Sequence, residues 1–264
     1  MAHVLTAIKD GVGTVTLNRP EALNALSEEM TKGLIEAASR FERDEAARCV
    51  LIRGAGDHFM AGGDVKGFYE RLKANQAEHA AGLEWRVNML HAMIYSFRRM
   101  KKPTVVSVQG AAAGFGLSLM MAADLAIASD DAFFTLAYAN IGFSADGGAT
   151  YWLPRLVGTR KALEIAYLAE RFDAAKAKDL GIVNFVVPRA SLEAETEKLV
   201  KRLAGGPTFA YGEVKKLMHD SLETDFDSQL HREAEAIARC AASADHLEGV
   251  SAFVEKRKPA FKGR

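Results

Sequence analysis

Cysteine is nearly absent from this chain: Cys49 and Cys240 are the only two in 264 residues. Two cysteines so far apart in the sequence do not make a disulfide framework, so a small cross-linked scaffold is not expected. Cys49 stands beside Val50 in an apolar run that predicts a strand, and we interpret it as a buried free thiol.

Excess charge and long apolar runs are also absent. Lysine plus arginine and aspartate plus glutamate number 34 each, so the formal net charge is zero and no nucleic-acid partner is expected. The longest apolar stretch, Leu117–Ala128, contains Asp124 and is too short to span a bilayer, so no membrane partner is expected. Because the chain starts with strand-like alternation and carries no signal or transit segment, we expect a cytoplasmic protein.

The composition is that of a globular protein with one large domain, or one domain with a small appendage. Apolar residues make up 49% and charged residues 26% of the chain. Asp10-Gly11 predicts a β-hairpin between His3–Lys9 and Val12–Asn18. Ser27 predicts the N-cap of a helix that ends near Arg43.

Short apolar runs alternate with helical sequence along the first two thirds of the chain. The runs that predict strands are Val50–Arg53, Thr104–Val108, Leu125–Ala128, Phe133–Leu136 and Val183–Val187. A stripe of apolar residues at helical spacing predicts a long helix over Glu78–Arg99. This alternation predicts a layered α/β core. After Gly205-Gly206-Pro207 the sequence predicts three helical stretches that end near Arg257.

Two loops rich in small residues each join a predicted strand to a predicted helix. They are Phe59-Met60-Ala61-Gly62-Gly63-Asp64 and Gly110-Ala111-Ala112-Ala113-Gly114-Phe115-Gly116. Small residues let the backbone approach a ligand closely, and the first amides of a helix have no acceptor within it. Two such loops can each give one N–H to the same oxygen and form an oxyanion hole.

The second loop also has the glycine spacing of short-chain dehydrogenases, with Tyr211 and Lys215 as a catalytic pair. In a dinucleotide-binding domain, however, the glycine fingerprint belongs to the first strand–helix unit, and here a long patterned segment precedes it. A glycine spacing alone is weak evidence. The short-chain dehydrogenase therefore stays a remote alternative.

Four segments in order carry a resemblance to a known family. The pattern F-x-A-G-x-D fits Phe59–Asp64, G-x-x-x-G-x-G fits Gly110–Gly116, and I-G-x-x-x-D-G-G fits Ile141–Gly148. The segment Glu248–Pro259 is also typical of this family. The chain resembles the crotonase, or enoyl-CoA hydratase/isomerase, superfamily. The resemblance implies an α/β crotonase (ClpP/crotonase-like) fold of repeated ββα units, with a core over residues 1–204 and a C-terminal helical trimerisation region over 205–264.

The resemblance also implies a ligand and a set of site residues. The ligand is the coenzyme A thioester of an acyl group, coenzyme A being part of the substrate, and no separate cofactor is expected. The backbone amides of Gly63 and Phe115 would be the oxyanion donors. Other residues expected to contact substrate are Ala61, Lys66, Gly114, Ser118, Tyr138, Phe253 and Lys256. The implied assembly is a homotrimer or a dimer of trimers.

The positions that distinguish one reaction from another depart from the hydratase pattern. Hydratases of the family use two glutamates, and Ser118 and Tyr138 stand at those positions here. Neither serves as a carboxylate base at neutral pH. Asp146 is the carboxylate left at a family catalytic position, although it precedes Gly147-Gly148 and could instead cap a helix.

The sequence therefore favours an isomerase that shifts a double bond, or modifies an acyl ring, through Asp146. An enoyl-CoA hydratase with another base and a non-catalytic acyl-CoA-binding homologue remain as alternatives. None of the seven histidines falls in a metal-binding motif, so no metal is expected.

Overall fold

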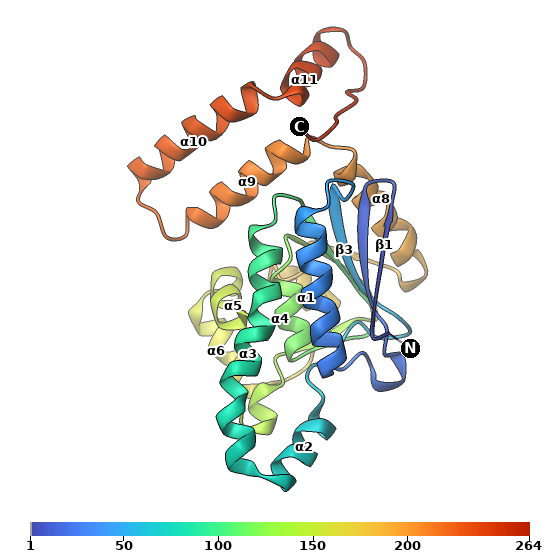
Figure 1. Cartoon of the computed structure of the whole chain (residues 1–264), viewed down its shortest axis with the longest axis vertical. Coiled ribbons are helices and arrows are strands. Elements are labelled where there is room, and N and C mark those ends of the chain that lie inside the picture. The colour runs from blue at the N-terminus through green and yellow to red at the C-terminus, as the bar shows by residue number, and fades with distance from the viewer. Residues whose placement is uncertain (1) are drawn as a thin grey trace.

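The computed structural model describes residues 2–264, which form two sheets and a set of surrounding helices (Figure 1). The larger sheet has the strand order β1-β2-β3-β4-β6-β9, and only the β1–β2 pair is antiparallel. Its strands are β1 Val4–Lys9, β2 Val12–Leu17, β3 Cys49–Gly54, β4 Thr104–Val108, β6 Leu125–Ser129 and β9 Phe185–Val187. The predicted hairpin is confirmed, since Asp10 and Gly11 both take positive φ at its turn.

A second, smaller sheet has the order β5-β7-β8 and includes one of the glycine-rich loops. Its strands are β5 Ala111–Ala113, β7 Phe133–Thr135 and β8 Phe172–Asp173. The sequence predicted a loop at Ala111–Ala113, and this is wrong. These three alanines pair in parallel with Phe133–Thr135, because the neighbouring strand supplies a ladder that no local pattern reveals.

Helices cover both faces of the larger sheet. On one face lie α1 Glu28–Arg43 and α3 Gln76–Arg99, and on the other lies α8 Leu192–Ala204. The strands supply side chains to both faces by alternation. Val50 and Ile52 of β3 pack toward α1 and α3, whereas Cys49 and Leu51 pack toward α8. Cys49 is a buried free thiol, as predicted, and burial raises its pKa to about 12.

The predicted helix caps and boundaries agree closely with the structure. Ser27 caps α1 by accepting a hydrogen bond from the Met30 amide at 3.1 Å. The remaining core helices are α2 Val65–Ala74, α4 Phe115–Met121, α5 Ala149–Val157, α6 Thr159–Leu168 and α7 Ala174–Asp179, with the short 3₁₀ turns η1 Pro20–Ala22, η2 Tyr138–Ile141 and η3 Arg189–Ser191.

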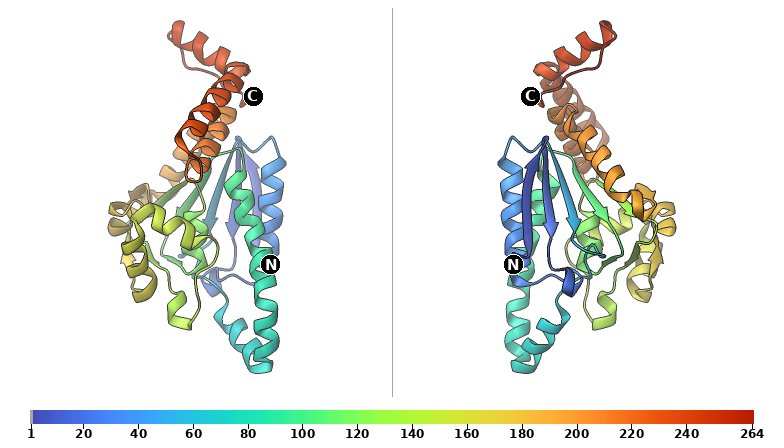
Figure 2. Two further views of the ribbon diagram at one scale, coloured as in Figure 1. Left: turned by 90° about the vertical axis from the view of Figure 1, so that its left-hand side faces the viewer. Right: turned by 90° about the vertical axis from the view of Figure 1, so that its right-hand side faces the viewer.

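The last three helices form an arm that projects from one end of the core (Figures 1 and 2). They are α9 Thr208–Asp220, α10 Phe226–Ala241 and α11 Ala244–Val254. Arg48 fastens the base of the arm, because its guanidinium donates to Thr208 at 3.1 Å and to the carbonyl of Phe261 at 3.0 Å. The three predicted C-terminal helices are confirmed, and the boundary near residue 205 stays a prediction.

Candidate active site

The two glycine-rich loops lie in direct backbone contact. The Met60 amide donates to the carbonyl of Ala111, and the Ala113 amide donates to the carbonyl of Met60, both at 2.9 Å. Gly116 must be glycine, because a Cβ at this position would lie 2.4 Å from the carbonyl oxygen of Met60. The tertiary fold therefore brings together two loops that are remote in sequence.

Two backbone amides at this junction are free to bind a ligand. Phe115 is the first residue of α4, so its N–H has no acceptor within the helix. Among residues 2–264, neither the Phe115 amide nor the Gly63 amide donates a hydrogen bond. Both residues line the same cavity. Two unpaired backbone amides in one cavity are the groups from which an oxyanion hole can be built.

The cavity has a volume of about 880 Å³ and lies between α1, α2, α3 and the segment from Ala137 to Asp146. Its walls are largely apolar, with Leu26, Ile35, Phe68, Leu90 and Phe143 among the lining side chains. Phe68 packs against Phe143, with ring centroids 6.0 Å apart. A mostly apolar cavity with a few convergent polar groups is typical of a site for a small molecule.

Asp146 is the carboxylate that faces this cavity without a cation or a helix end as its partner. The Tyr138 hydroxyl donates to its Oδ1 atom, and the Ser118 hydroxyl lies 3.0 Å from the Tyr138 hydroxyl. Burial raises the pKa of Asp146 above its usual range, although the Tyr138 hydrogen bond and the neighbouring His91 oppose the shift. A raised pKa makes a carboxylate a stronger base near neutral pH.

The other two carboxylates that line the cavity have different surroundings. Asp64 caps α2 by accepting from the Gly67 amide at 3.1 Å and pairs with Arg19 at 2.9 Å. Burial alone would raise the pKa of Asp64, but these two partners outweigh it and the pKa is lowered. The Glu28 side chain is exposed at the rim and lies 3.5 Å from Arg71.

Asp146 does not cap the helix that follows it. The N-cap residue of α5 is Gly148, and no side chain accepts a hydrogen bond from the first turn. The Ala149 amide instead donates to the backbone carbonyl of Asp146 at 3.1 Å. The carboxylate is therefore turned away from the helix and toward Tyr138.

His91 is a site residue that the sequence did not reveal. It lines the cavity from α3, and its Nε2 atom accepts a hydrogen bond from the Gly147 amide at 3.1 Å. This bond connects α3 to the residue directly after Asp146. In the sequence, His91 is distinguished only as a polar residue beside Leu90 in the apolar stripe. It gains its partner because α3 packs against the loop that contains Gly147.

The remaining site residues predicted from the sequence divide into two groups. Ala61 and Gly114 line the cavity beside the two free amides. Lys66 is exposed and does not line the cavity. Phe253 lies in the last turn of α11 on the projecting arm and Lys256 follows the helix, and 85% of the Phe253 surface is exposed. Within one chain, the fold does not bring these three residues to the cavity.

The pair expected of a dehydrogenase is not at the glycine loops. Lys215 is buried at the other end of α4, where its ammonium group pairs with Asp124 at 2.9 Å. It also donates to the carbonyl of Phe97 at 2.7 Å. Lys215 therefore fastens α9 to the core, and Tyr211 lies one turn before it on the same helix.

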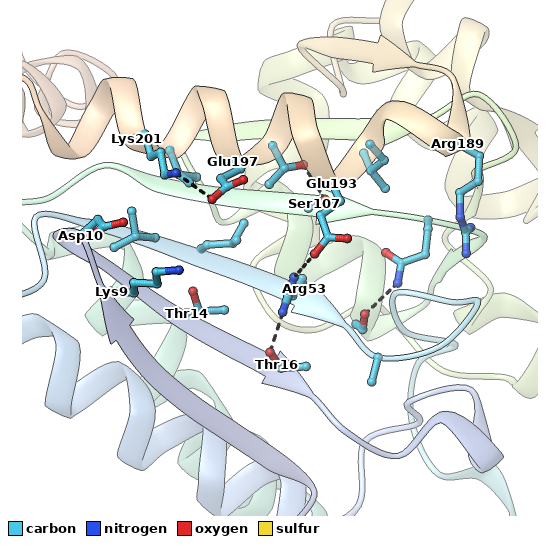
Figure 3. Close-up of a pocket in the computed structure, with 18 of the residues that line it drawn as sticks. Lys9, Asp10, Thr14, Thr16, Arg53, Ser107, Arg189, Glu193, Glu197 and Lys201 are labelled. Carbon is cyan, nitrogen blue, oxygen red and sulfur yellow. Dashed lines mark hydrogen bonds and ion pairs between the residues drawn. The ribbon is translucent and has the colours of Figure 1, made fainter.

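A second cavity, of about 640 Å³, lies on the opposite face of the larger sheet beside α8 (Figure 3). Four of its charged side chains form two ion pairs: Lys201 with Glu197 at 2.8 Å, and Arg53 with Glu193 at 3.5 Å. The two free amides and Asp146 lie on the other side of the sheet. The cavity between α1, α2 and α3 is therefore the candidate active site.

Residues 2–264 contain neither a metal-binding cluster nor a helix that could cross a membrane. No cluster of three or more histidine, cysteine, aspartate or glutamate side chains there has the geometry to hold a metal ion. No helix in the same residues is both long enough and apolar enough to cross a membrane.

Comparison with known proteins agrees with this geometry. The sequence pattern of the enoyl-CoA hydratase/isomerase family matches residues 7–264. The chain belongs to the enoyl-CoA hydratase/isomerase family. It is 34% identical over 265 residues to 1,2-epoxyphenylacetyl-CoA isomerase of Escherichia coli, with 100% of both chains covered. It is 32% identical over 260 residues to crotonyl-CoA hydratase of Syntrophomonas wolfei, with 98% and 97% covered.

Solved structures confirm the fold class. The crystal structure of an enoyl-CoA hydratase from Polaromonas sp. JS666 has a TM-score of 0.91 and 32% identity to this chain, and the match covers 98% of this chain and 99% of that one. The predicted crotonase fold with a helical C-terminal region is thus confirmed. Both isomerases and hydratases occur among the relatives, so the family alone does not define the reaction.

Proposed function

We propose that this protein is an acyl-CoA isomerase that shifts a double bond, or modifies an acyl ring, by proton transfer through Asp146. One observation carries the proposal: a carboxylate with a raised pKa shares a cavity with two free backbone amides. The other lining carboxylates are a helix cap with a cationic partner and an exposed rim residue.

The proposed chemistry begins at the thioester carbonyl. The amides of Gly63 and Phe115 donate to its oxygen, and Asp146 removes a proton from a carbon of the acyl group. The electron pair of the broken C–H bond moves into the enolate, whose oxygen each donor stabilises by about 3 kcal/mol in comparable sites. Asp146 then returns the proton to a different carbon, which moves the double bond.

Hydration is disfavoured by the residues beside Asp146. It needs one group to activate a water and another to deliver a proton to the α-carbon. Burial, together with the charge of Asp146, raises the pKa of Tyr138, so this phenol stays protonated and does not act as a base. Ser118 is a buried hydroxyl without a basic partner. One carboxylate is sufficient for an isomerase. A hydratase needs a second acid–base group, and neither Tyr138 nor Ser118 supplies one here.

We further propose that coenzyme A thioesters are the substrates and that the active form is a homotrimer or a dimer of trimers. The family membership supports the first point. The exposure of Phe253 on the arm supports the second, because a neighbouring subunit would cover it. Phe253, Lys256 and Lys66 would then contact the ligand in the assembled protein and not within one chain.

The experiment compares turnover of 3-enoyl-CoA substrates with hydration of crotonyl-CoA. We expect isomerisation in the wild type and little hydration. The substitution Asp146→Asn should lower isomerase turnover by about 100-fold or more, the scale of general-base catalysis, while leaving ligand affinity nearly unchanged. Glu28→Gln is the matched control, since it neutralises a rim carboxylate of the same cavity and should keep turnover near that of the wild type.

The alternatives predict different outcomes. Strong hydration that survives Asp146→Asn would identify a hydratase with another base. Binding without turnover across a wide panel of acyl-CoA thioesters would identify a non-catalytic homologue. Turnover that requires a nicotinamide cofactor would identify a dehydrogenase.

A further inference from the structure

Three polar side chains from three different elements form a chain at the base of the cavity. Ser118 lies on α4 and is fully buried, Tyr138 begins η2, and Asp146 precedes α5. Ser118 Oγ is 3.0 Å from the Tyr138 hydroxyl, which in turn contacts Oδ1 of Asp146. Ser118 and Tyr138 are the positions at which the family resemblance implies glutamates in hydratases. Here the two side chains are joined to the remaining carboxylate.

The chemistry of the three groups fixes the direction of the hydrogen bonds. An ionised carboxylate only accepts, and a phenol has a single proton to donate. Tyr138 therefore donates to Asp146, and its oxygen must accept from Ser118. The other acceptor near the Ser118 hydroxyl, the carbonyl of Gly114, is farther away, at 3.4 Å. The donor chain thus runs from α4 through Tyr138 to Oδ1 of Asp146.

We propose that Tyr138, oriented by its hydrogen bond from Ser118, occupies Oδ1 of Asp146 and so leaves Oδ2 as the atom that takes the substrate proton and returns it. This inference rests on the proposed isomerase function. In the first step the C–H bond breaks, its electron pair enters the enolate, and the proton bonds to Oδ2. In the second step the enolate electron pair forms the new C–H bond with this proton at another carbon, and the O–H electron pair stays on Oδ2, so that the carboxylate is ionised again. Tyr138 keeps its own proton throughout and acts as a positioning residue.

The surroundings of Asp146 support this division of roles. The titratable groups that face it are Tyr138 from η2 and His91 from α3. Burial raises the pKa of Asp146, whereas the hydrogen bond from Tyr138 stabilises the ionised form and limits the rise. Removing the phenol hydroxyl should leave the burial and His91 in place, so the carboxyl should hold its proton to a higher pH.

The test measures the protonation of Asp146 without relying on turnover. The full-length protein is prepared with ¹³C-labelled aspartate, and the Asp146 carboxyl signal is assigned by its loss in Asp146→Asn. In Tyr138→Phe the titration midpoint of that signal should rise by about one pH unit. Ser118→Ala should give a smaller rise, because Tyr138 remains but loses the donor that polarises it. Tyr151→Phe is the control: Tyr151 donates to Glu223 at 3.1 Å outside the cavity, so the midpoint should not change.

Each result of this titration either supports or overturns the proposed role of Tyr138 and Ser118. A midpoint that is unchanged in Tyr138→Phe overturns the proposal, even if turnover falls, because the phenol would then act by shape alone. If Tyr138→Phe does not fold, an unchanged midpoint in Ser118→Ala overturns it. A raised midpoint in a protein without isomerase turnover would support the hydrogen-bond chain and refute the proposed function, so the two failures are distinguishable.

Discussion

At the scale of single residues, Asp146 should determine how turnover depends on pH. Proton abstraction needs the ionised carboxylate, and burial raises the pKa of this group above the ordinary aspartate value of 3.8. Turnover should therefore rise with pH through a midpoint above that value and level off once the carboxylate is ionised. A pH–rate profile at saturating substrate measures this. An acid limb centred at or below the ordinary aspartate pKa would contradict the assignment of Asp146 as the base.

Asp146 should also affect the stability of the protein. The direction of this effect follows from the difference between its pKa in the folded state and its pKa in the unfolded state. The pKa of Asp146 is higher in the folded state than in the unfolded state, so the folded protein binds the proton more tightly. The stabilisation from this group is complete below the unfolded pKa and is lost as pH rises through the folded pKa. At pH 7 the ionised Asp146 therefore lowers the free energy of unfolding, and the substitution Asp146→Asn removes this loss.

We expect the melting temperature of Asp146→Asn at pH 7 to equal or exceed that of the wild type. At a pH below the ordinary aspartate pKa, the two proteins should melt at nearly the same temperature. Calorimetric scans at both pH values check this. A loss of stability at pH 7 would mean that the carboxylate is needed for folding, which would remove the main argument for a catalytic role.

At the scale of elements, the contact between the two glycine-rich loops should be sensitive to a single added methyl group. In Gly116→Ala the new Cβ would lie 2.4 Å from the Met60 carbonyl, which is backbone and cannot rotate away. The loops must then separate, so we expect a loss of about 1–3 kcal/mol in unfolding free energy and a large loss of turnover. Urea unfolding and steady-state kinetics measure the two effects.

Gly67→Ala is the matched control for stability. Gly67 lies within α2, and a Cβ there meets only ordinary contacts, the closest at 3.5 Å. Alanine favours the helix over glycine by up to about 1 kcal/mol, so this variant should be as stable as the wild type or more so. Equal effects at the two glycines would show that the loop contact has no special role.

At the scale of the whole molecule, the arm carries exposed large apolar side chains on all three of its helices. Several large apolar side chains on α9–α11 are at least half exposed, among them Met218, Phe226, Ile237, Leu247 and Phe253. Large apolar side chains exposed together on a projecting element are typical of an interaction surface. We therefore expect the arm to pack against other copies of the chain.

Light scattering should give a trimer or hexamer in the wild type. Ile237→Glu introduces a charge on α10 at a side chain with 74% of its surface exposed, so it should weaken the assembly without disturbing the core. Leu5→Glu is the control, because Leu5 is an exposed apolar residue on β1, away from the arm. A wild type that scatters as a monomer at all concentrations would refute the oligomer.

Much of the architecture follows from local sequence patterns. The hairpin at Asp10-Gly11, the Ser27 cap and the alternating strands are dictated by turn chemistry, capping and side-chain periodicity, which act over a few residues. The motifs at Phe59–Asp64, Gly110–Gly116 and Ile141–Gly148 were sufficient to identify the family, because they occur in order along the whole chain.

Other features depend on contacts between segments that are distant in sequence. The strand at Ala111–Ala113 exists because Phe133–Thr135 pairs with it. His91 belongs to the candidate site because α3 places its ring where it accepts a hydrogen bond from the Gly147 amide. No residue near His91 in the sequence predicts that contact. Whether Asp146 caps α5 was open from sequence, since a carboxylate before two glycines fits either role. The tertiary fold decided it by placing Tyr138 within reach of Oδ1, so that the carboxylate is turned to the cavity while a backbone carbonyl receives the first amide of the helix.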